Sequence, residues 1–282
     1  QVGWGKLDAI AVTQGPGLVG ALLVGLAYAK ALAYSLGLPF LGVNHLEGHV
    51  YSVFMDHPEA ETPALSLVVS GGHTNLYFLK GIGEYELLAK TRDDAAGEAL
   101  DKLSKFLGLG YPGGPVIEKL AKLGNSRKVR FTMPKITDGS LDFSFSGIKT
   151  AALRYVKENN IERIASEAGQ VSTGLPPIVL DLVASYQQSI IDQLINRLEK
   201  ALSNCEAKSI QVSGGVSCNT ALREQIASHF ASKGVPVYTP QPSLTTDNAA
   251  MIAASGYLRL KNGAADPWDL PADPNLKLRC SS

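Results

Sequence analysis

Apolar residues in the first part of the chain form runs whose lengths match the strands and helices of one layer. Residues 7–13 form a short apolar run, residues 15–17 a Gly-Pro-Gly turn, and residues 18–36 a long apolar stretch. A second short run, residues 39–43, leads directly into a helical pattern that begins near His45. A strand–turn–helix–strand–helix order predicts an α/β layer with partly parallel strands.

The rest of the chain alternates strands and glycine-rich turns with longer helices. Residues 64–70 and 75–80 predict a hairpin with a glycine-rich tip. A long helix is predicted over 176–203, because apolar residues recur there at every third or fourth position. The remaining predicted elements are helices at 94–107, after the loop 110–115, at 220–233 and at 246–260, and strands at 209–213 and 235–238. The whole pattern is of the α/β class.

Composition narrows the class of protein without naming a function. Lys plus Arg and Asp plus Glu are equal at 26, so the net charge is zero, which argues against nucleic-acid binding by overall charge alone. A local basic patch is compatible with this balance. The three cysteines, Cys205, Cys218 and Cys280, show no metal-binding or disulfide spacing, as expected in a reducing cytoplasm. We predict that residues 18–38, interrupted by Lys30, form a buried helix rather than a membrane span.

Two histidines four positions apart, His45 and His49, are the sharpest chemical signal in the sequence. On a helix this spacing places both rings on one face, where they can bind one metal ion with one or two further ligands. A helix with two histidines that bind no metal gives the same pattern. The pair directly follows a predicted strand, and α/β folds place ligand sites at such junctions, which favours the metal site.

Asp247 is the candidate for a third metal ligand. It lies at the predicted start of the closing helix, where an aspartate also serves as an N-cap, and one side chain can do both. In the helical zinc proteases a glutamate directly follows the first histidine. Here Glu47 comes one position later and faces another side of the helix, which disfavours a protease. Glu47 is a candidate general base by proximity only.

Two predicted strands end in the same Ser-Gly-Gly turn, in VVSGG at residues 68–72 and in QVSGG at residues 211–215. Glycines in such turns let backbone N–H groups approach an anion, and they suit a plain hairpin equally well. An actin-like nucleotide fold holds phosphates with two such turns that face each other across a cleft, and this arrangement is our expectation.

Three further positions are candidates for nucleotide binding. Asp101, on the helix after the hairpin, can accept hydrogen bonds from a ribose diol, or it can lie on a solvated helix face. Gly114 belongs to a Gly-Gly pair that permits close approach of a base or sugar, or simply begins a helix. Asn219 follows a glycine loop at a predicted helix N-terminus, where it can cap the helix or contact a base.

Seven stretches covering essentially the whole chain are more specific together than any one motif: GPGLVGALLVG, NHLEGH, LVVSGGHTNL, DDAAGEALDKLSKFLGLGYPGGP, FSFSGIKTA, VSGGVSCNTALR and TDNAAMIA. In this order they resemble the tRNA N6-adenosine threonylcarbamoyltransferases, the TsaD/OSGEP-like family of tRNA modification. The GYPGGP and SGIKTA stretches are similar to its bacterial and organellar branch.

The resemblance implies an α/β fold of the actin-like ATPase type (ASKHA, as in Hsp70 and sugar kinases), with two lobes around a nucleotide cleft. Residues 1–62 and 246–282 would form the first lobe and residues 63–245 the second. The family's metal ligands fall on His45, His49 and Asp247. Its substrate-binding positions fall on Val68, Val69, Ser70, Gly71, Gly72, Asp101, Gly114 and Asn219.

The resemblance also implies a reaction and its participants. The threonylcarbamoyl group would pass from threonylcarbamoyl-AMP to N6 of the adenosine 3′ of the anticodon, in tRNAs that read codons beginning with adenine, and AMP would leave. One divalent metal ion, iron in preference to zinc, would bind per subunit. In bacteria the partners would be an inactive paralogue of the same fold (TsaB-like) and a small ATPase (TsaE-like). The expected location is the cytoplasm, or the mitochondrion in a eukaryote.

Family members open with a strand that precedes the Gly-Pro-Gly loop and is absent from this sequence, so we expect an incomplete first lobe and limited activity of this chain alone. Two other functions share parts of the pattern. A metalloprotease would use the paired histidines, and an actin-fold small-molecule kinase would not need His45.

Overall fold

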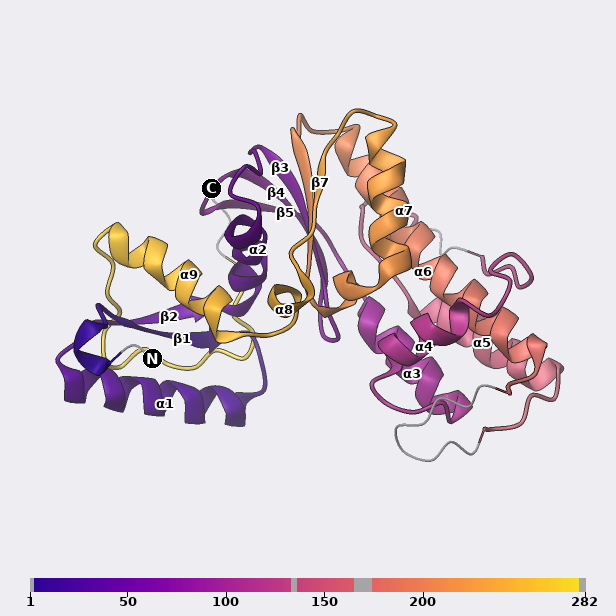
Figure 1. The fold of residues 1–282 in the computed structure, drawn as a ribbon, viewed down its shortest axis with the longest axis horizontal. Coiled ribbons are helices and arrows are strands. Elements are labelled where there is room, and N and C mark those ends of the chain that lie inside the picture. Colours follow the sequence, from indigo (N-terminus) through magenta and orange to yellow (C-terminus); the bar gives the residue numbers. More distant parts are fainter. Residues whose placement is uncertain (1–2, 133–135, 165–173, 279–282) are drawn as a thin grey trace. The chain divides into compact units, whose positions relative to one another are not determined.

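Residues 3–132, 136–164 and 174–278 are described in the computed structural model, so Cys280 lies outside the described part. The chain divides into two units (Figure 1). Unit 1 comprises Gln1–Ala60 and Pro240–Ser282, and unit 2 comprises Glu61–Thr239.

Unit 1 is built on two parallel strands, β1 (Ile10–Gly15) and β2 (Phe40–Asn44). The crossover between them is α1 (Val19–Leu36), which packs on one side of the pair. Helices α2 (His45–Asp56) and α9 (Ala249–Lys261) lie on the other side (Figure 1). The predicted strand–helix–strand–helix order is confirmed, and it brings the histidine-bearing helix beside the helix that follows Asp247.

The prediction that the long apolar stretch is a buried helix is wrong. Along α1 only one narrow side is buried, through Leu22, Leu26, Ala29 and Ala33. Val24, Tyr28 and Tyr34 are 73%, 68% and 77% exposed. By length and composition alone α1 is also apolar enough to cross a membrane, and 22% of it is buried. A continuous exposed apolar side marks a contact surface.

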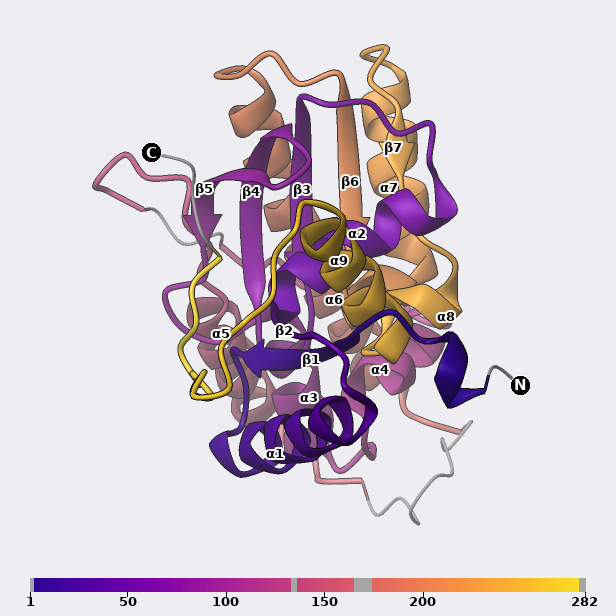
Figure 2. The ribbon, with the colours of Figure 1, turned by 90° about the vertical axis from the view of Figure 1, so that its left-hand side faces the viewer.

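Unit 2 is built on a five-stranded mixed sheet in the order β5-β4-β3-β6-β7 (Figure 2). Its strands are β3 (Ala64–Val69), β4 (Thr74–Gly81), β5 (Glu84–Lys90), β6 (Ser209–Ser213) and β7 (Val237–Tyr238). β3, β4 and β5 pair antiparallel, whereas β6 lies parallel to both β3 and β7. The hairpin is confirmed. The pattern missed β5, because an edge strand with charged residues has only a weak apolar signal.

Five helices cover one face of this sheet and share one apolar core with it (Figure 1). They are α3 (Ala96–Leu107), α4 (Gly113–Ala121), α5 (Ser146–Glu158), α6 (Pro177–Leu202) and α7 (Thr220–Ala231). The apolar residues that recur along α6 are buried in this core, which confirms the predicted long helix. Three short elements complete the described structure: η1 (Trp4–Lys6), η2 (Gly215–Cys218) and α8 (Pro242–Thr245).

Two adjacent aspartates fasten the loop before α3 to the start of α5. Asp93 accepts hydrogen bonds from the hydroxyls of Ser144 and Ser146 at 2.6 and 2.7 Å and from two backbone N–H groups. Asp94 accepts from Lys102 Nζ at 2.5 Å and from Lys149 Nζ at 2.6 Å. The lysine of the FSFSGIKT stretch therefore supports the fold around α3.

Candidate metal centre and nucleotide pocket

The first two metal-ligand candidates are set by the start of α2. The side-chain oxygen of Asn44, the last residue of β2, accepts from the N–H groups of Leu46 at 2.9 Å and Glu47 at 3.4 Å. This N-cap starts the helix at His45, directly beyond the strand. His45 and His49 then lie one turn apart, with ring centroids separated by 4.7 Å. The helical spacing predicted for the pair is confirmed.

The third candidate, Asp247, precedes the cap of α9 and is not the cap itself. Helix α9 begins at Ala249, and the side chain of Asn248 accepts from Met251 N at 2.9 Å. The predicted capping role of Asp247 is therefore wrong, because an asparagine one position later performs it. Asp247 lies in the turn between α8 and α9 with a side chain that is 76% exposed.

The three side chains converge at one point within unit 1. One ligand atom from each of His45, His49 and Asp247 lies within 4.8 Å of the other two. Asp247 Oδ1 is 3.5 Å from His45 Nε2 and 3.2 Å from His49 Nε2. Two imidazoles and a carboxylate at these distances can hold one metal ion.

The environment of His49 tests whether this group fits a metal. Its side chain is fully buried, and neither ring nitrogen has a partner with hydrogen-bond geometry among the described residues, although Asp247 lies close to Nε2. Burying an unsatisfied polar ring costs about 1–3 kcal/mol. A metal ion bound to one nitrogen removes part of that cost, so the residues present fit the metal.

Gly48 explains how α2 comes so close to the start of α9. A Cβ built on Gly48 would lie 3.0 Å from Ile252 Cδ1 and 3.1 Å from Met251 Cγ. A side chain here would fit only if Ile252 and Met251 shifted by a few tenths of an ångström. Glu47 does not share this side of α2, because it is two positions from each histidine and two positions turn a helix by roughly 200°.

A pocket of about 210 Å³ lies in unit 2 between α3, α4 and the glycine turns. It is lined by Gly71, Gly97, Leu100, Asp101, Pro112, Gly114, Pro115, Glu118, Gly215, Val216, Cys218 and Asn219. Small-molecule sites usually measure roughly 300–1,000 Å³, so this pocket matches part of a nucleotide rather than all of it.

Close backbone approaches build the pocket. Asp101 Oδ1 accepts from Gly113 N at 2.6 Å and thereby joins α3 to the start of α4. A Cβ on Gly97 would lie 2.7 Å from the carbonyl oxygen of Ser70 and 2.8 Å from Gly71 Cα, so only glycine lets α3 reach the hairpin tip. Asp101 therefore does not lie on a solvated helix face; its carboxylate is held at the pocket wall.

The two Ser-Gly-Gly turns lie side by side, and they do not face each other across a cleft. β3 and β6 are parallel neighbours, with Val68 opposite Ser213, so their turns leave the same edge of one sheet. Gly214 has a φ of 88°, and a Cβ on it would lie 2.4 Å from the carbonyl oxygen of Val69. Residues from both turns, Gly71 and Gly215, line the same pocket.

The structure brings four of the eight predicted substrate-binding residues to the pocket wall: Gly71, Asp101, Gly114 and Asn219. Of the other four, Val68 and Val69 are fully buried in β3, Ser70 bonds within the turn through its N–H and hydroxyl, and Gly72 is exposed. Both ends of the Asn219 amide are already engaged. Its oxygen caps α7 through Leu222 N at 3.0 Å, and its Nδ2 donates to Gln187 Oε1 at 2.8 Å.

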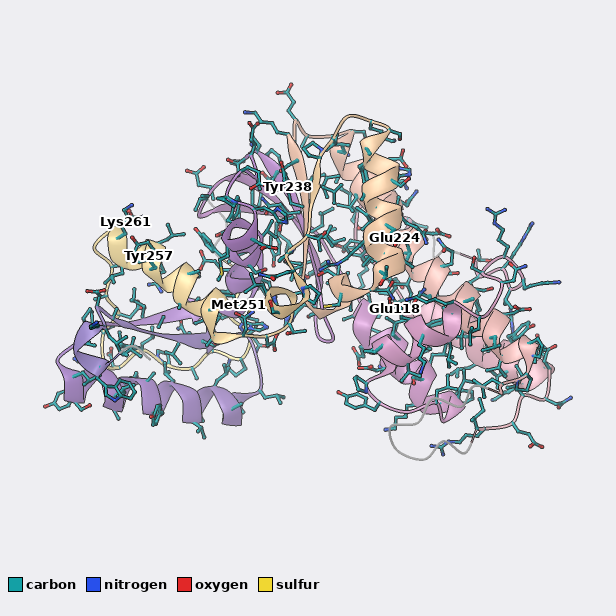
Figure 3. The ribbon with its side chains drawn as sticks, in the orientation of Figure 1. Glu118, Glu224, Tyr238, Met251, Tyr257 and Lys261 are labelled. Atoms are coloured by element: carbon teal, nitrogen blue, oxygen red, sulfur yellow. The ribbon has the colours of Figure 1, made fainter. Side chains whose placement is uncertain are left out.

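Glu118 is a pocket residue that sequence reasoning missed. It projects from α4 (Figure 3), and its Oε1 accepts from Thr220 N at 3.0 Å. The signal was present, because Glu118 follows Gly114 by four positions and so shares its side of the helix.

Comparison with known proteins gives one consistent family. The family model "TsaD: tRNA N6-adenosine threonylcarbamoyltransferase" matches residues 1–254. A relative of that name from Desulfitobacterium hafniense is 48% identical over 278 residues, which cover 99% of this chain and 78% of the relative. Another from Clostridioides difficile is 46% identical over 277 residues, covering 98% of this chain and 79% of the relative.

Solved structures of low sequence identity show the fold. The HypF protein of T. kodakarensis matches with a TM-score of 0.64 at 16% identity, covering 92% of this chain and 41% of that one. A full-length HypF in a phosphate- and nucleotide-bound form matches with a TM-score of 0.63 at 13% identity, covering 93% and 48%. The fold is α/β of the actin-like ATPase type, as expected from the sequence.

Proposed function

The chain belongs to the tRNA N6-adenosine threonylcarbamoyltransferase family and is a transferase that modifies tRNA, and on that premise we propose the substrates of its reaction. The donor is threonylcarbamoyl-AMP, and the acceptor is N6 of the adenosine 3′ of the anticodon in tRNAs that read codons beginning with adenine. A new C–N bond forms at N6, the anhydride C–O bond breaks, the amine gives up a proton, and AMP leaves.

This reaction asks for orientation and for exclusion of water. An exocyclic adenine amine is a weak nucleophile because its lone pair is delocalised, and a mixed anhydride is hydrolysed by water. Holding the two reactants in line and dry addresses both problems. The catalytic base remains unassigned, and the place of Glu47 away from the histidine side of α2 does not favour it.

The observation that carries the proposal is the glycine-walled pocket with Asp101 at its edge. Its size suits the adenosine part of the donor, and the glycines in its wall let a flat base and a sugar approach the backbone there. In this assignment Asp101 and Glu118 accept hydrogen bonds from the ribose hydroxyls. Gly71 and Gly72, where a Cβ would meet nothing within 4 Å, leave room for the donor's phosphate or carbonyl oxygen.

His45, His49 and Asp247 hold one divalent ion in this proposal. Two histidines and one carboxylate with open positions are the ligand set of many iron(II) sites, so iron is favoured over zinc. When bound, the ion supplies a Lewis acid for oxygens of the donor. The buried His49 ring keeps its ligand atom fixed, whereas the exposed Asp247 carboxylate is the ligand most open to exchange.

Protein partners belong to the same proposal. We assign to this chain the inactive paralogue of the same fold (TsaB-like) and the small ATPase (TsaE-like) that the resemblance implies. The exposed apolar side of α1 supports a partner that covers it.

The proposal is tested with the full chain, its partners, threonylcarbamoyl-AMP and an unmodified tRNA transcript, by analysing the nucleosides formed. His45→Ala is expected to abolish the modified adenosine, and His57→Ala, at the other end of α2, to leave it unchanged. No modified adenosine from the intact assembly contradicts the proposal. ATP-dependent phosphorylation that survives His45→Ala would favour the kinase, and peptide cleavage lost in Glu47→Ala would favour the protease.

A further inference from the structure

The positive charge of this neutral chain is concentrated in one segment. From Lys102 to Arg163 the sequence has 12 lysine and arginine residues against 5 aspartate and glutamate residues. Four of the basic residues are ion-paired, namely Lys102, Lys122, Lys149 and Arg154. Within the described residues no carboxylate pairs with the side chains of Lys105, Lys119, Arg127, Lys128, Arg130, Lys157 or Arg163, so their charge faces the solvent uncompensated.

An open groove of about 500 Å³ lies within this segment, between the end of α3, the end of α5 and the residues after α5. Lys105 and Arg163 line it with Phe106, an aromatic side chain that is 39% exposed. Lys102 and Glu162 also line the groove, so one carboxylate is present among three cations. Cations around an exposed ring are typical of surfaces that bind a single-stranded nucleic acid.

The backbone fixes Arg163 at this groove. Gly108 ends α3 in the left-handed conformation with a φ of 75°, and Ile164 N donates to Leu107 O at 2.8 Å. A Cβ on Gly108 would lie 2.1 Å from the Ile164 carbonyl oxygen and 3.0 Å from Arg163 Cγ. The segment carrying Arg163 is therefore held flat against the end of α3, and this contact depends on a glycine.

We propose that the groove at Lys105, Phe106 and Arg163 binds a single-stranded stretch of the tRNA substrate. The two cations contact consecutive phosphates, and one base stacks on Phe106. A net excess of positive charge around the groove is complementary to the RNA backbone. An acidic protein segment or an anionic membrane would use the cations but not the ring.

The groove and the nucleotide pocket share one helix. Asp101 lines the pocket, and Lys105 lines the groove one turn further along α3. An RNA strand in the groove would thus lie within the same unit as the donor adenosine. The inference rests on the proposed function, because it takes the tRNA as the strand that binds.

The test compares the wild-type full chain with the double variant Lys105→Glu/Arg163→Glu for binding of an unmodified tRNA transcript at several salt concentrations. We expect the double variant to lose at least tenfold in affinity near physiological salt. Its plot of log affinity against log salt should flatten by about 1.4, the value for two lost phosphate contacts at roughly 0.7 each. Phe106→Ala should lower affinity about tenfold without flattening the plot.

Lys200→Glu is the matched control, because Lys200 is an exposed lysine in the last turn of α6, as Lys105 is in the last turn of α3. It should bind tRNA as the wild type does. Binding of AMP, measured by calorimetry, should be unchanged in every variant. Three outcomes would contradict tRNA binding in the groove. They are wild-type tRNA affinity in the double variant, an equal loss of affinity in Lys200→Glu, and a preference of the wild type for anionic phospholipid vesicles over tRNA.

The two proposals fail separately. Binding of tRNA that depends on Lys105 and Arg163, without transfer by the intact assembly, would contradict the proposed function and keep the groove. Transfer by the intact assembly, with tRNA binding that does not depend on Lys105 or Arg163, would support the proposed function and contradict the proposal that tRNA binds in the groove.

Discussion

His49 Nε2 lies 3.2 Å from Asp247 Oδ1, and this pair joins α2 to the turn before α9, two parts of unit 1 that are far apart in the sequence. The imidazole is fully buried and the carboxylate is 76% exposed. The ring is therefore fixed by packing, whereas the carboxylate can move to meet an ion. Removing either partner has a different expected cost, since only the ring is part of the core.

His49→Ala is expected to abolish metal binding. Loss of residues that merely orient a ligand costs about 10–100-fold in affinity, so loss of a ligand itself should exceed 100-fold. Metal content after reloading with iron(II) or zinc(II) measures this directly. The stabilisation by bound metal, about 2.7 kcal/mol at 100 times Kd, should vanish with it.

His57→Ala is the control for that variant, because His57 pairs with Glu59 at 3.0 Å beyond the end of α2. It should keep one metal per chain. Full occupancy in His49→Ala would contradict the metal centre.

Gly48→Ala is expected to destabilise unit 1 by about 1 kcal/mol. Alanine gains up to about 1 kcal/mol over glycine in a helix, but overpacking a tight contact costs about 1–3 kcal/mol. The contacts at 3.0 Å to Ile252 and 3.1 Å to Met251 make overpacking the larger effect. Both tryptophans, Trp4 and Trp268, belong to unit 1, so tryptophan fluorescence in a denaturant titration reports its unfolding.

Gly25→Ala provides the opposite expectation in the same unit. A Cβ on Gly25, within α1, would meet nothing closer than 3.9 Å. That variant should gain about 0.5–1 kcal/mol. Equal stabilisation by both substitutions would show that Gly48 is not needed for close packing, and unchanged metal affinity in Gly48→Ala would show that the centre tolerates helix displacement.

Local signals in the sequence were sufficient for most elements and for the histidine pair. The spacing of apolar residues and the glycine-rich turns predicted β1, α1, β2, the hairpin and α6, because such elements depend mainly on residues that are close in the sequence. The spacing of His45 and His49 survives into the structure since α2 is regular over both. The strand β5 escaped because it lies at a sheet edge, where little apolar surface is buried.

Contacts between distant segments could not be read from pattern. The burial of α1 depends on what packs against it, and only one narrow side is covered. The apolar pattern locates the start of a helix only to within a few residues, so it could not show that Asn248 rather than Asp247 caps α9. Glu118 shares the side of α4 that carries Gly114, but its contact with Thr220 N at the start of α7 joins segments about 100 residues apart, which no local pattern indicates.

Asp101→Ala is expected to weaken AMP binding by about tenfold or more, because a charged hydrogen-bond partner of a ligand contributes about 1.5–3 kcal/mol. It also removes the acceptor of Gly113 N, so thermal stability should fall by about 1 kcal/mol. Asp101→Asn keeps an oxygen for Gly113 and should retain stability while losing affinity. Calorimetry with AMP and thermal unfolding separate the two effects. Unchanged affinity in both variants would remove Asp101 from the site.

Asp94→Asn is expected to destabilise unit 2 at neutral pH and to make its stability less sensitive to acid. Burial would raise the pKa of Asp94, but hydrogen bonds and charge from Lys102 and Lys149 outweigh it, so the pKa is lowered. A carboxyl group with a lowered pKa in the folded state stabilises the protein fully above its unfolded pKa of about 3.9, and that contribution is lost as pH falls through the folded value.

The expected loss in Asp94→Asn is about 2 kcal/mol at pH 7, since the side chain is only 12% exposed and bonds to two charged donors. The gap between wild type and variant should narrow as the pH falls below about 4, where the wild-type carboxylate becomes protonated. Urea unfolding followed by circular dichroism at pH 7 and pH 3 measures both values, and Glu224→Gln, an exposed carboxylate on α7, is the control (Figure 3). A gap that stays constant between these pH values would mean that packing, rather than the two lysines, fixes Asp94.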